Sequence, residues 1–86
     1  MHYMYVLQAL DDLEVFYLGF SSNLKQRVRM HNAGANASTA RHQWRVAYYE
    51  AYVSEGAARR REAILKRSSS MRSRLMARIR SDLQND

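Results

Sequence analysis

The sequence predicts a small α/β fold of the α+β kind, in which a three-stranded antiparallel sheet is flanked by three helices. Three observations predict it: two closely spaced aromatic and β-branched segments near the N-terminus, a similar segment at residues 44–53, and three segments with apolar residues at helical spacing. The predicted order is strand, strand, helix, strand, helix, helix. At 86 residues the chain has room for one domain, which we expect to span residues 1–86.

Residues 3–10 and 15–20 are expected to form the first two strands, paired as an antiparallel hairpin. The first segment ends in the turn signal Asp11-Asp12, and only a short polar gap separates the two. Side chains alternate between the two faces of a strand, so every second residue shares a face. The residues predicted to do so are Tyr3, Tyr5 and Leu7 in the first strand and Val15, Tyr17 and Gly19 in the second.

Capping residues and apolar spacing define the other elements. Ser21-Ser22-Asn23 offers N-caps for a helix from Leu24 that ends near residues 32–34, and the small, polar stretch 34–43 is expected to be a loop. Residues 44–53 are the third predicted strand. Ser54 caps a second helix, and the serines at 68–70 interrupt it before a third helix at about residues 71–83. The core candidates are Ala58, Ile64 and Leu65 in the second helix, and Met71, Leu75, Met76, Ile79 and Leu83 in the third.

The charge balance indicates an anionic partner. Lys and Arg number 14 against 8 Asp and Glu, giving a net charge of +6, and arginine is well suited to binding phosphate. Absence of cysteine rules out disulfides and a thiolate zinc site. No apolar run approaches the roughly 18 residues that span a membrane, so we expect a cytoplasmic protein without membrane association. The cations concentrated in the last third, a plausible DNA-backbone surface, are Arg59, Arg60, Arg61, Lys66, Arg67, Arg72, Arg74, Arg78 and Arg80.

A small set of residues could supply chemistry. Arg27 and His31 are four residues apart in the first predicted helix and therefore share a face, which can lie near Tyr17 because the helix directly follows the second strand. Glu62 is a single carboxylate within a strongly cationic helix. It could bind a magnesium ion, which is often held by one or two protein oxygens, or form a surface ion pair with Lys66. Each residue alone is weak evidence of function.

These residues also resemble a known family. Tyr3-Met4-Tyr5 followed by Tyr17-Leu18-Gly19 resembles the two short motifs that name the GIY-YIG nucleases. The resemblance continues through nearly the whole chain, and the ordered combination with Arg27, His31 and Glu62 is specific. Further segments that match are 23–32 as the family's first helix, 38–44 as its loop, 46–52 as its third strand and 58–66 as the helix with its glutamate.

The resemblance implies a metal-dependent DNA endonuclease with Mg²⁺ or Mn²⁺ as cofactor, and a role in DNA repair or recombination is expected from it. Tyr5 and Tyr17 would be the motif tyrosines, Arg27 the catalytic arginine, His31 an assisting residue that hydrogen-bonds to a phenol, and Glu62 the metal ligand. Either tyrosine could take the proton of the attacking water, with Arg27 and metal-bound water favouring its phenolate. The residues expected to contact DNA are Tyr3, Gly19, Lys25, Arg41, Lys66 and Arg67.

Three departures from the family pattern and two other interpretations accompany this prediction. Besides Tyr3 in place of the motif glycine, Phe20 follows Gly19 where a small or polar residue is more usual, and Arg59 stands where an apolar residue is expected. One alternative function is a catalytically weak or inactive DNA-binding module that needs a protein partner. A third interpretation is a protein-interaction domain that uses the stripe of Met71, Leu75, Met76 and Ile79.

Overall fold

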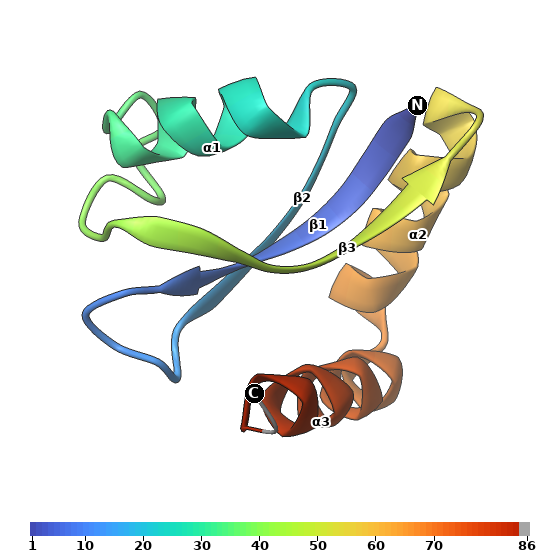
Figure 1. Cartoon of the computed structure of the whole chain (residues 1–86). Helices are drawn as coiled ribbons and strands as arrows, with labels where there is room; N and C mark the ends of the chain where they lie inside the picture. Colours follow the sequence, from blue (N-terminus) through green and yellow to red (C-terminus); the bar gives the residue numbers. More distant parts are fainter. Residues whose placement is uncertain (85–86) are drawn as a thin grey trace.

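The computed structural model describes residues 1–84 and has the predicted order of elements. Two strands are followed by a helix, a third strand and two further helices (Figure 1). Their bounds are β1 His2–Ala9, β2 Phe16–Ser21, α1 Leu24–Asn32, β3 Trp44–Tyr52, α2 Glu55–Arg67 and α3 Ser69–Gln84. The predicted α+β fold is therefore confirmed.

The central strand of the sheet is β1, which pairs antiparallel with β2 on one side and with β3 on the other. Tyr5 of β1 lies opposite Gly19 of β2 and opposite Tyr49 of β3. These three residues therefore form a row across the sheet, with Tyr5 in the middle.

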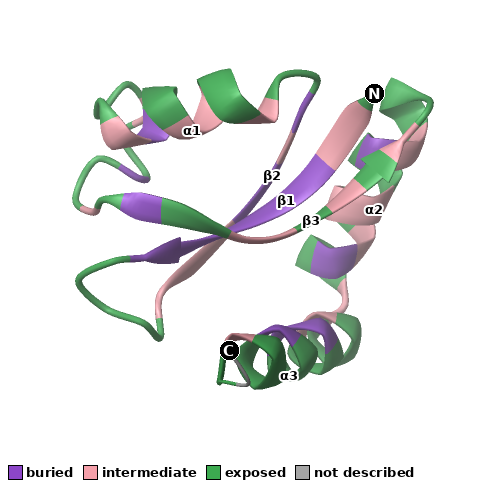
Figure 2. Ribbon diagram, viewed as in Figure 1, coloured by how far each residue is buried: buried purple, intermediate pink, exposed green. Residues whose placement is uncertain are grey.

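The two faces of the sheet bury two separate apolar clusters, as the purple segments of β1 and of α3 indicate in Figure 2. Helix α1 covers one face, where Leu24 and Val28 pack against the buried residues Tyr5, Leu7, Ala9 and Trp44. Helices α2 and α3 cover the opposite face, on the other side of the sheet from α1 (Figure 1). The buried residues of that cluster are Met4, Val6, Leu18, Leu65, Leu75, Met76 and Ile79. The alternation predicted for β1 is confirmed, because Tyr5 and Leu7 share the α1 face.

The predicted capping residues begin the first two helices. The side chain of Asn23 accepts a hydrogen bond from the backbone N–H of Gln26 at 3.1 Å, and that of Ser54 accepts one from Ala57 at 3.1 Å. Helix α1 ends where Gly34 adopts a φ of 77° and donates its N–H to the carbonyl oxygen of His31. This left-handed conformation is readily available to glycine, so Gly34 fixes where α1 ends and the following loop begins.

The boundary between α2 and α3 differs from the prediction. Between α2 and α3 only Ser68 lies outside the helices, and its hydroxyl accepts a hydrogen bond from the N–H of Met71, so α3 begins at Ser69 rather than at Met71.

Two of the predicted core residues of α2 and α3 are less buried than expected. Met71 is 39% exposed, so its assignment to the core was wrong, and Ile64 is only half-buried. Most of the predicted stripe of α3 is buried against the sheet, which removes it as a surface for a partner protein. None of the helices within residues 1–84 is long and apolar enough to cross a membrane.

Candidate active site

Four elements of the fold bring the five candidate catalytic residues together. Tyr5 lies on β1, Tyr17 on β2, Arg27 and His31 on α1, and Glu62 on α2. The hydroxyl of Tyr5 lies 2.8 Å from Nε2 of His31, and the ring centroids of Tyr17 and His31 are 5.0 Å apart. The charges of Arg27 and Glu62 both act on the phenol of Tyr5. Residues separated by more than half of the sequence therefore form one cluster.

The hydrogen bonds of His31 define its protonation. The hydroxyl of Thr39 donates to the backbone carbonyl of Asn36 at 3.2 Å, so its oxygen accepts the proton on Nδ1 of His31 at 2.8 Å. A neutral imidazole with its proton on Nδ1 has a lone pair on Nε2, and the hydroxyl of Tyr5 donates to it. Burial and then the charge of Arg27 lower the pKa of His31, which favours this neutral form.

Tyr5 is held in its protonated form. Burial is the main cause that raises the pKa of Tyr5 to about 12, and the nearby Tyr17 and Glu62 add to the rise. Arg27 lowers this pKa, as the sequence predicted. Burial outweighs the effect of Arg27 on the pKa of Tyr5, and Tyr5 acts as a hydrogen-bond donor at neutral pH.

Tyr17 differs from Tyr5 in its access to solvent. Tyr17 is half-buried, whereas Tyr5 is only 1% exposed. The ammonium group of Lys66 lies 5.9 Å from the centroid of the Tyr17 ring and 3.5 Å from the carboxylate of Glu62. The ion pair considered as an alternative for Glu62 is thus present, but a pair with a half-exposed lysine contributes only ~0.3–0.5 kcal/mol. It leaves the carboxylate available for other ligands.

Gly19 provides the space that Tyr5 occupies. A Cβ atom added at Gly19 would lie 2.6 Å from Cζ of the Tyr5 ring, and real Cβ atoms do not approach other atoms so closely. The phenol of Tyr5 therefore rests directly on the backbone of β2. Gly19 is buried, and the absence of a side chain there makes room for the ring of Tyr5. The contact of Gly19 with DNA stays a prediction.

The donor groups fit a hydrated divalent cation better than a fully protein-bound one. Within residues 1–84, no group of three or more His, Asp or Glu side chains is arranged to hold a metal ion. Glu62 is the carboxylate next to the two phenols, and its side chain is 16% exposed. Mg²⁺ keeps several waters and is commonly bound by one or two carboxylates together with substrate phosphate. Glu62 therefore fits the role of ligand to such an ion.

The other residues expected to contact DNA are distributed around this cluster. Lys66 lies at the cluster, beside Tyr17, whereas Tyr3 and Lys25 line a groove on the neighbouring part of the sheet. Arg41 lines a separate depression near the β1–β2 turn, and Arg67 is exposed at the C-terminal end of α2. The structure therefore brings only some of these residues to the candidate site.

Two of the three departures from the family pattern, Phe20 and Arg59, form a single contact. The guanidinium of Arg59 lies 5.1 Å from the centroid of the Phe20 ring. A cation over an aromatic face is a favourable arrangement, so the two unusual residues accompany each other. Other arginines of the basic C-terminal third also bond within the chain: Arg72 donates to the carbonyl oxygens of Leu65 and Lys66, and Arg80 pairs with Glu14 at 3.2 Å. These arginines are therefore only partly available to DNA.

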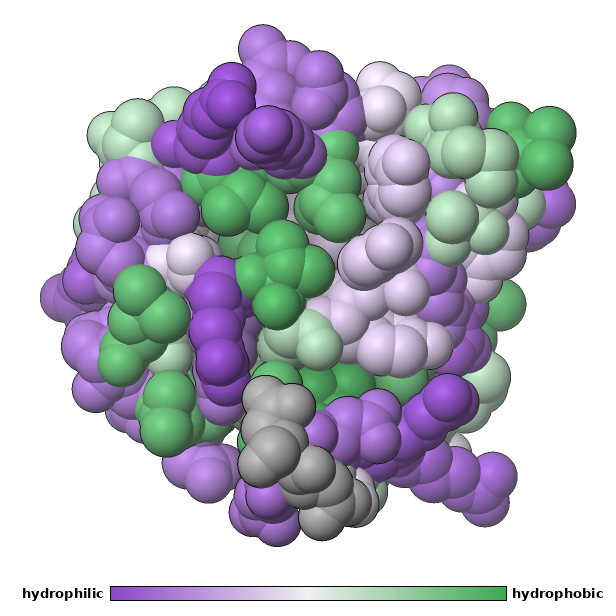
Figure 3. Space-filling model, in the orientation of Figure 1, coloured by the Kyte–Doolittle hydropathy of each residue, from purple (hydrophilic) through white to green (hydrophobic). Residues whose placement is uncertain are grey.

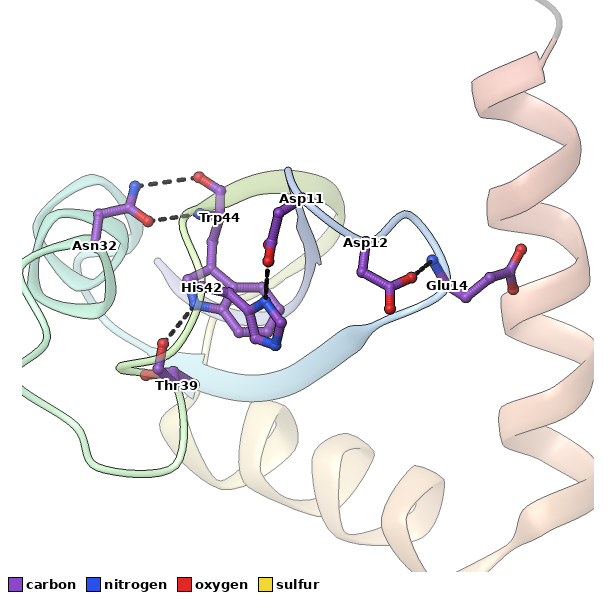
Figure 4. Close-up of polar contacts among 7 residues, drawn as sticks. All are labelled: Asp11, Asp12, Glu14, Asn32, Thr39, His42 and Trp44. Carbon is purple, nitrogen blue, oxygen red and sulfur yellow. Dashed lines mark hydrogen bonds and ion pairs between the residues drawn. The ribbon is translucent and has the colours of Figure 1, made fainter.

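Asn32, Thr39 and Trp44 hold the loop 33–43 in place (Figure 4), a role that was not predicted from the sequence. The side-chain amide of Asn32 accepts from the N–H of Trp44 at 2.6 Å and donates to its carbonyl at 3.1 Å, as a neighbouring strand would. The indole N–H of Trp44 donates to the carbonyl of Thr39 at 2.9 Å, which positions Thr39 beneath His31. A buried indole requires an acceptor, so Trp44 was the available signal that the loop is ordered.

A second polar cluster lies on the opposite face of the sheet. The carboxylate of Glu50 accepts hydrogen bonds from the hydroxyls of Tyr48 and Tyr52, and from Nε of Arg61 at 2.9 Å. A second nitrogen of Arg61 lies 3.1 Å from the same carboxylate, so the pair is bidentate. Despite the cost of burial, these bonds lower the pKa of Glu50, while burial and the carboxylate raise the pKa of Tyr52 to about 12. This cluster joins β3 to α2.

The comparison with known families assigns this fold, with two tyrosines, an arginine and a glutamate beside its sheet, to a nuclease-type class of protein. The chain belongs to the GIY-YIG catalytic domain family, whose model matches residues 1–74. UPF0213 proteins from Streptococcus pyogenes serotype M1 and serotype M4 are each 40% identical to it over 67 residues, which cover 76% of this chain and 71% of the relative. No solved structure was found to match the chain. The family resemblance seen in the sequence is therefore confirmed.

Proposed function

We propose that this chain is a divalent-metal-dependent endonuclease that hydrolyses phosphodiester bonds in DNA. The observation that supports this most is the convergence of Tyr5, Tyr17, Arg27, His31 and Glu62 from four elements on one cluster. Membership of a nuclease-type family and the net charge of +6 support the same conclusion.

In this mechanism the half-buried phenol of Tyr17 and the buried phenol of Tyr5 have different roles. Tyr17, which is partly accessible to solvent, orients the attacking water and, in its phenolate form, accepts the water's proton as the water oxygen bonds to phosphorus and the bond to the leaving oxygen breaks; the leaving oxygen takes a proton from solvent. Arg27 binds the phosphate and stabilises the negative charge that develops on it. Mg²⁺ or Mn²⁺ held by Glu62 would supply Lewis-acid stabilisation of the phosphate and the leaving oxygen.

Tyr5, His31 and Thr39 form a buried chain of hydrogen bonds next to the reacting groups. Because Tyr5 donates its hydrogen bond to His31, the lone pairs of its oxygen stay available to Arg27, whose charge acts on the phenol. Thr39 fixes the tautomer of His31 and thereby the direction of the Tyr5 bond. This buried chain positions the guanidinium of Arg27, and a pre-positioned guanidinium costs no reorganisation when charge develops.

A nicking assay tests the proposal. Wild-type protein with Mg²⁺ or Mn²⁺ is incubated with supercoiled plasmid and with single-stranded, flap and junction DNA, and nicking by wild type is expected on at least one of them. Glu62→Gln should abolish nicking and Tyr17→Phe should lower the rate by about 10²- to 10⁴-fold, the range for loss of a general base. Glu55→Gln, at the exposed N-terminal end of the same helix, is the matched control and should cut like wild type.

DNA binding separates the enzyme from the alternative of a binding module that needs a partner. Glu62→Gln should retain DNA binding while it loses cutting, because it removes a metal ligand without removing a cation. If the wild type binds every substrate and cuts none, the isolated chain is a binding module. A cytoplasmic location and a role in DNA repair or recombination remain predictions, which cell fractionation and sensitivity of a deletion strain to DNA damage would test.

A further inference from the structure

A groove of the described part of the molecule lies beside the candidate site, between α1 and β3. Its volume is about 660 Å³, and its apolar lining residues are Leu24, Val28 and Val46. Tyr3 and Tyr49 also line it, together with the basic residues Lys25 and Arg29. In Figure 3, a green hydrophobic area lies directly below the purple, hydrophilic side chains over α1, with paler side chains beside it. The groove thus combines apolar side chains, two phenol rings and two basic side chains.

The two tyrosines of the groove are not core residues. Tyr49 is 55% exposed, and its ring meets that of Tyr3 edge to face with centroids 5.8 Å apart. Tyr48 and Tyr52, on the same strand, instead point to the opposite face, where both hydroxyls donate to Glu50. Tyr48 and Tyr52 therefore have a structural role, whereas Tyr49 presents a large aromatic surface to solvent.

Helix α1 separates the groove from the reacting groups. Leu24 and Val28 face the sheet, and helical spacing places Arg27 on one flank of this apolar stripe and Lys25 and Arg29 on the other. The flank with Arg27 belongs to the site around Tyr5, and the flank with Lys25 and Arg29 belongs to the groove. Among the described residues that line the groove none is acidic, so its charge suits a phosphate backbone.

The register of the sheet sets the distance between the groove and the site. Tyr49 is the cross-strand neighbour of Tyr5, and directly opposed residues of antiparallel strands have Cα atoms only ~4.5–5.5 Å apart. Tyr3 lies two residues before Tyr5 on the same face of β1. A nucleotide in the groove would therefore be a near neighbour, along one strand, of a phosphate bound at Arg27.

We propose that this groove binds an unpaired nucleotide of a DNA strand, with the base stacked on Tyr49 and the backbone phosphates on Lys25 and Arg29. Aromatic side chains in a basic groove are the usual way in which proteins bind single strands, since every base has a π face. In a fully paired duplex the π faces are covered by neighbouring base pairs. The inference rests on the proposed nuclease function and gives it a substrate class: DNA with an unpaired nucleotide next to the cleaved bond.

Binding measured in EDTA tests the groove independently of cutting. Fluorescence anisotropy with a labelled 12-nucleotide oligo(dT) and with a 12-base-pair duplex compares the wild type with Tyr49→Ala and Tyr49→Phe. Tyr49→Ala should weaken binding of the single strand by about 5- to 150-fold, the range for loss of one stacked base, and leave duplex binding unchanged. Tyr49→Phe, which keeps the ring, should bind like wild type. Val53→Ala, at an exposed residue beyond the end of β3, is the control for loss of apolar surface.

The outcomes distinguish this inference from the proposed function. If Tyr49→Ala binds oligo(dT) like wild type, or weakens single strand and duplex equally, the groove is not a base-stacking site even if the wild type nicks DNA; a groove for a protein segment would give this result. If the single-strand defect appears but no DNA is cut, the groove inference stands and the nuclease proposal fails. Where the wild type cuts, Tyr49→Ala should slow cleavage beside unpaired nucleotides more than cleavage of paired duplex.

Discussion

The two polar clusters on opposite faces of the sheet satisfy the hydrogen bonds of their buried polar groups in different ways. Under α1, Tyr5, His31 and Thr39 form a chain of neutral hydrogen bonds. Under α2, Glu50 and Arg61 form a charged pair completed by two tyrosine hydroxyls. Within residues 1–84, no buried side-chain nitrogen or oxygen lacks a hydrogen-bond partner. The buried polar atoms of both clusters are therefore hydrogen-bonded, but only the Glu50 cluster pairs a charged group with an opposite charge of its own.

The difference separates the residues that stabilise the fold from those positioned for chemistry. The charged cluster has matched its carboxylate with a guanidinium, so little of its charge is left for a ligand. At the neutral cluster, Arg27 and Glu62 lie near the phenols, and the ion pair of Glu62 is with a half-exposed lysine. Substitutions in the charged cluster should therefore lower stability, and substitutions beside the neutral one should lower activity.

The largest effect on stability is expected from Arg61→Met. The carboxylate of Glu50 would keep its two tyrosine donors but lose its only bidentate partner while staying mostly buried. Breaking a fully buried pair costs ~3–5 kcal/mol, and because both side chains are partly exposed we expect about 2–3 kcal/mol. Urea unfolding measures this cost. Arg60→Met, at the exposed neighbouring position, should change stability by less than ~0.5 kcal/mol.

An unchanged unfolding midpoint in Arg61→Met would contradict a stabilising role of the Glu50 cluster. If folded Arg61→Met protein, assayed well below its melting temperature, lost nicking activity to the same extent as Tyr17→Phe, the cluster would not be purely structural.

Gly19→Ala should affect the neutral cluster through Tyr5. The added methyl group would collide with the phenol of Tyr5, which is 1% exposed. An overpacking cost of about 1–3 kcal/mol is therefore expected. Displacement of Tyr5 should also disturb Arg27 and lower the nicking rate by about 10²-fold. Gly56→Ala is the matched control, since there the new Cβ meets only a flexible arginine at an ordinary distance of 3.5 Å. A fully active Gly19→Ala protein would contradict the seating of Tyr5 on β2.

Thr39→Val keeps the shape of the side chain and removes the acceptor of His31. The N–H at Nδ1 would then be buried without a partner, which costs about 1–2 kcal/mol unless the imidazole changes tautomer. Nitrogen NMR shifts of the imidazole report the tautomer directly and should show Nδ1 protonated in the wild type and a shift towards Nε2 protonation in the variant. Ser38→Ala, next to it in the exposed part of the loop, should leave the His31 spectrum as it is in wild type. An unchanged spectrum together with an unchanged free energy of unfolding in Thr39→Val would exclude the proposed direction of the Tyr5 hydrogen bond.

The fold was predictable because its local signals agree with one another. Alternation in the strands, caps at Asn23 and Ser54, and apolar spacing in the helices each specify one element, and the structure has them in that order. The error at Met71 has a local cause. Ser68 alone ends α2 and caps α3, so the later serines join the helix, and the apolar stripe that contacts the sheet begins only at Leu75.

The candidate site was predictable only in part. Arg27, His31 and Tyr17 could be placed near one another from helical spacing and chain order, but Thr39 reaches His31 through a loop whose path depends on Asn32 and Trp44. The Glu50 cluster was missed for a related reason: whether a strand carboxylate is buried against a helix arginine depends on how β3 and α2 pack, which spacing within either element does not define.

The smallest effect, and the one that distinguishes the two clusters under a single condition, is their response to acid. The pKa of His31 is lowered by burial and by Arg27 from an ordinary 6.5, so below about pH 6.5 the unfolded chain takes up a proton that the folded chain resists. Stability contributed by neutral His31 is therefore complete above pH 6.5 and is lost as the pH falls towards its folded pKa. Glu50 has a lowered pKa relative to 4.5, so its contribution is lost only at pH values below that. Unfolding free energies measured from pH 7 to 5 should fall more steeply in wild type than in His31→Gln, and a His42→Gln variant removes the contribution of the surface pair with Asp11. Equal slopes in wild type and His31→Gln would mean that the imidazole is not held neutral by the fold, and the neutral chain beneath the candidate site would then have to be rejected.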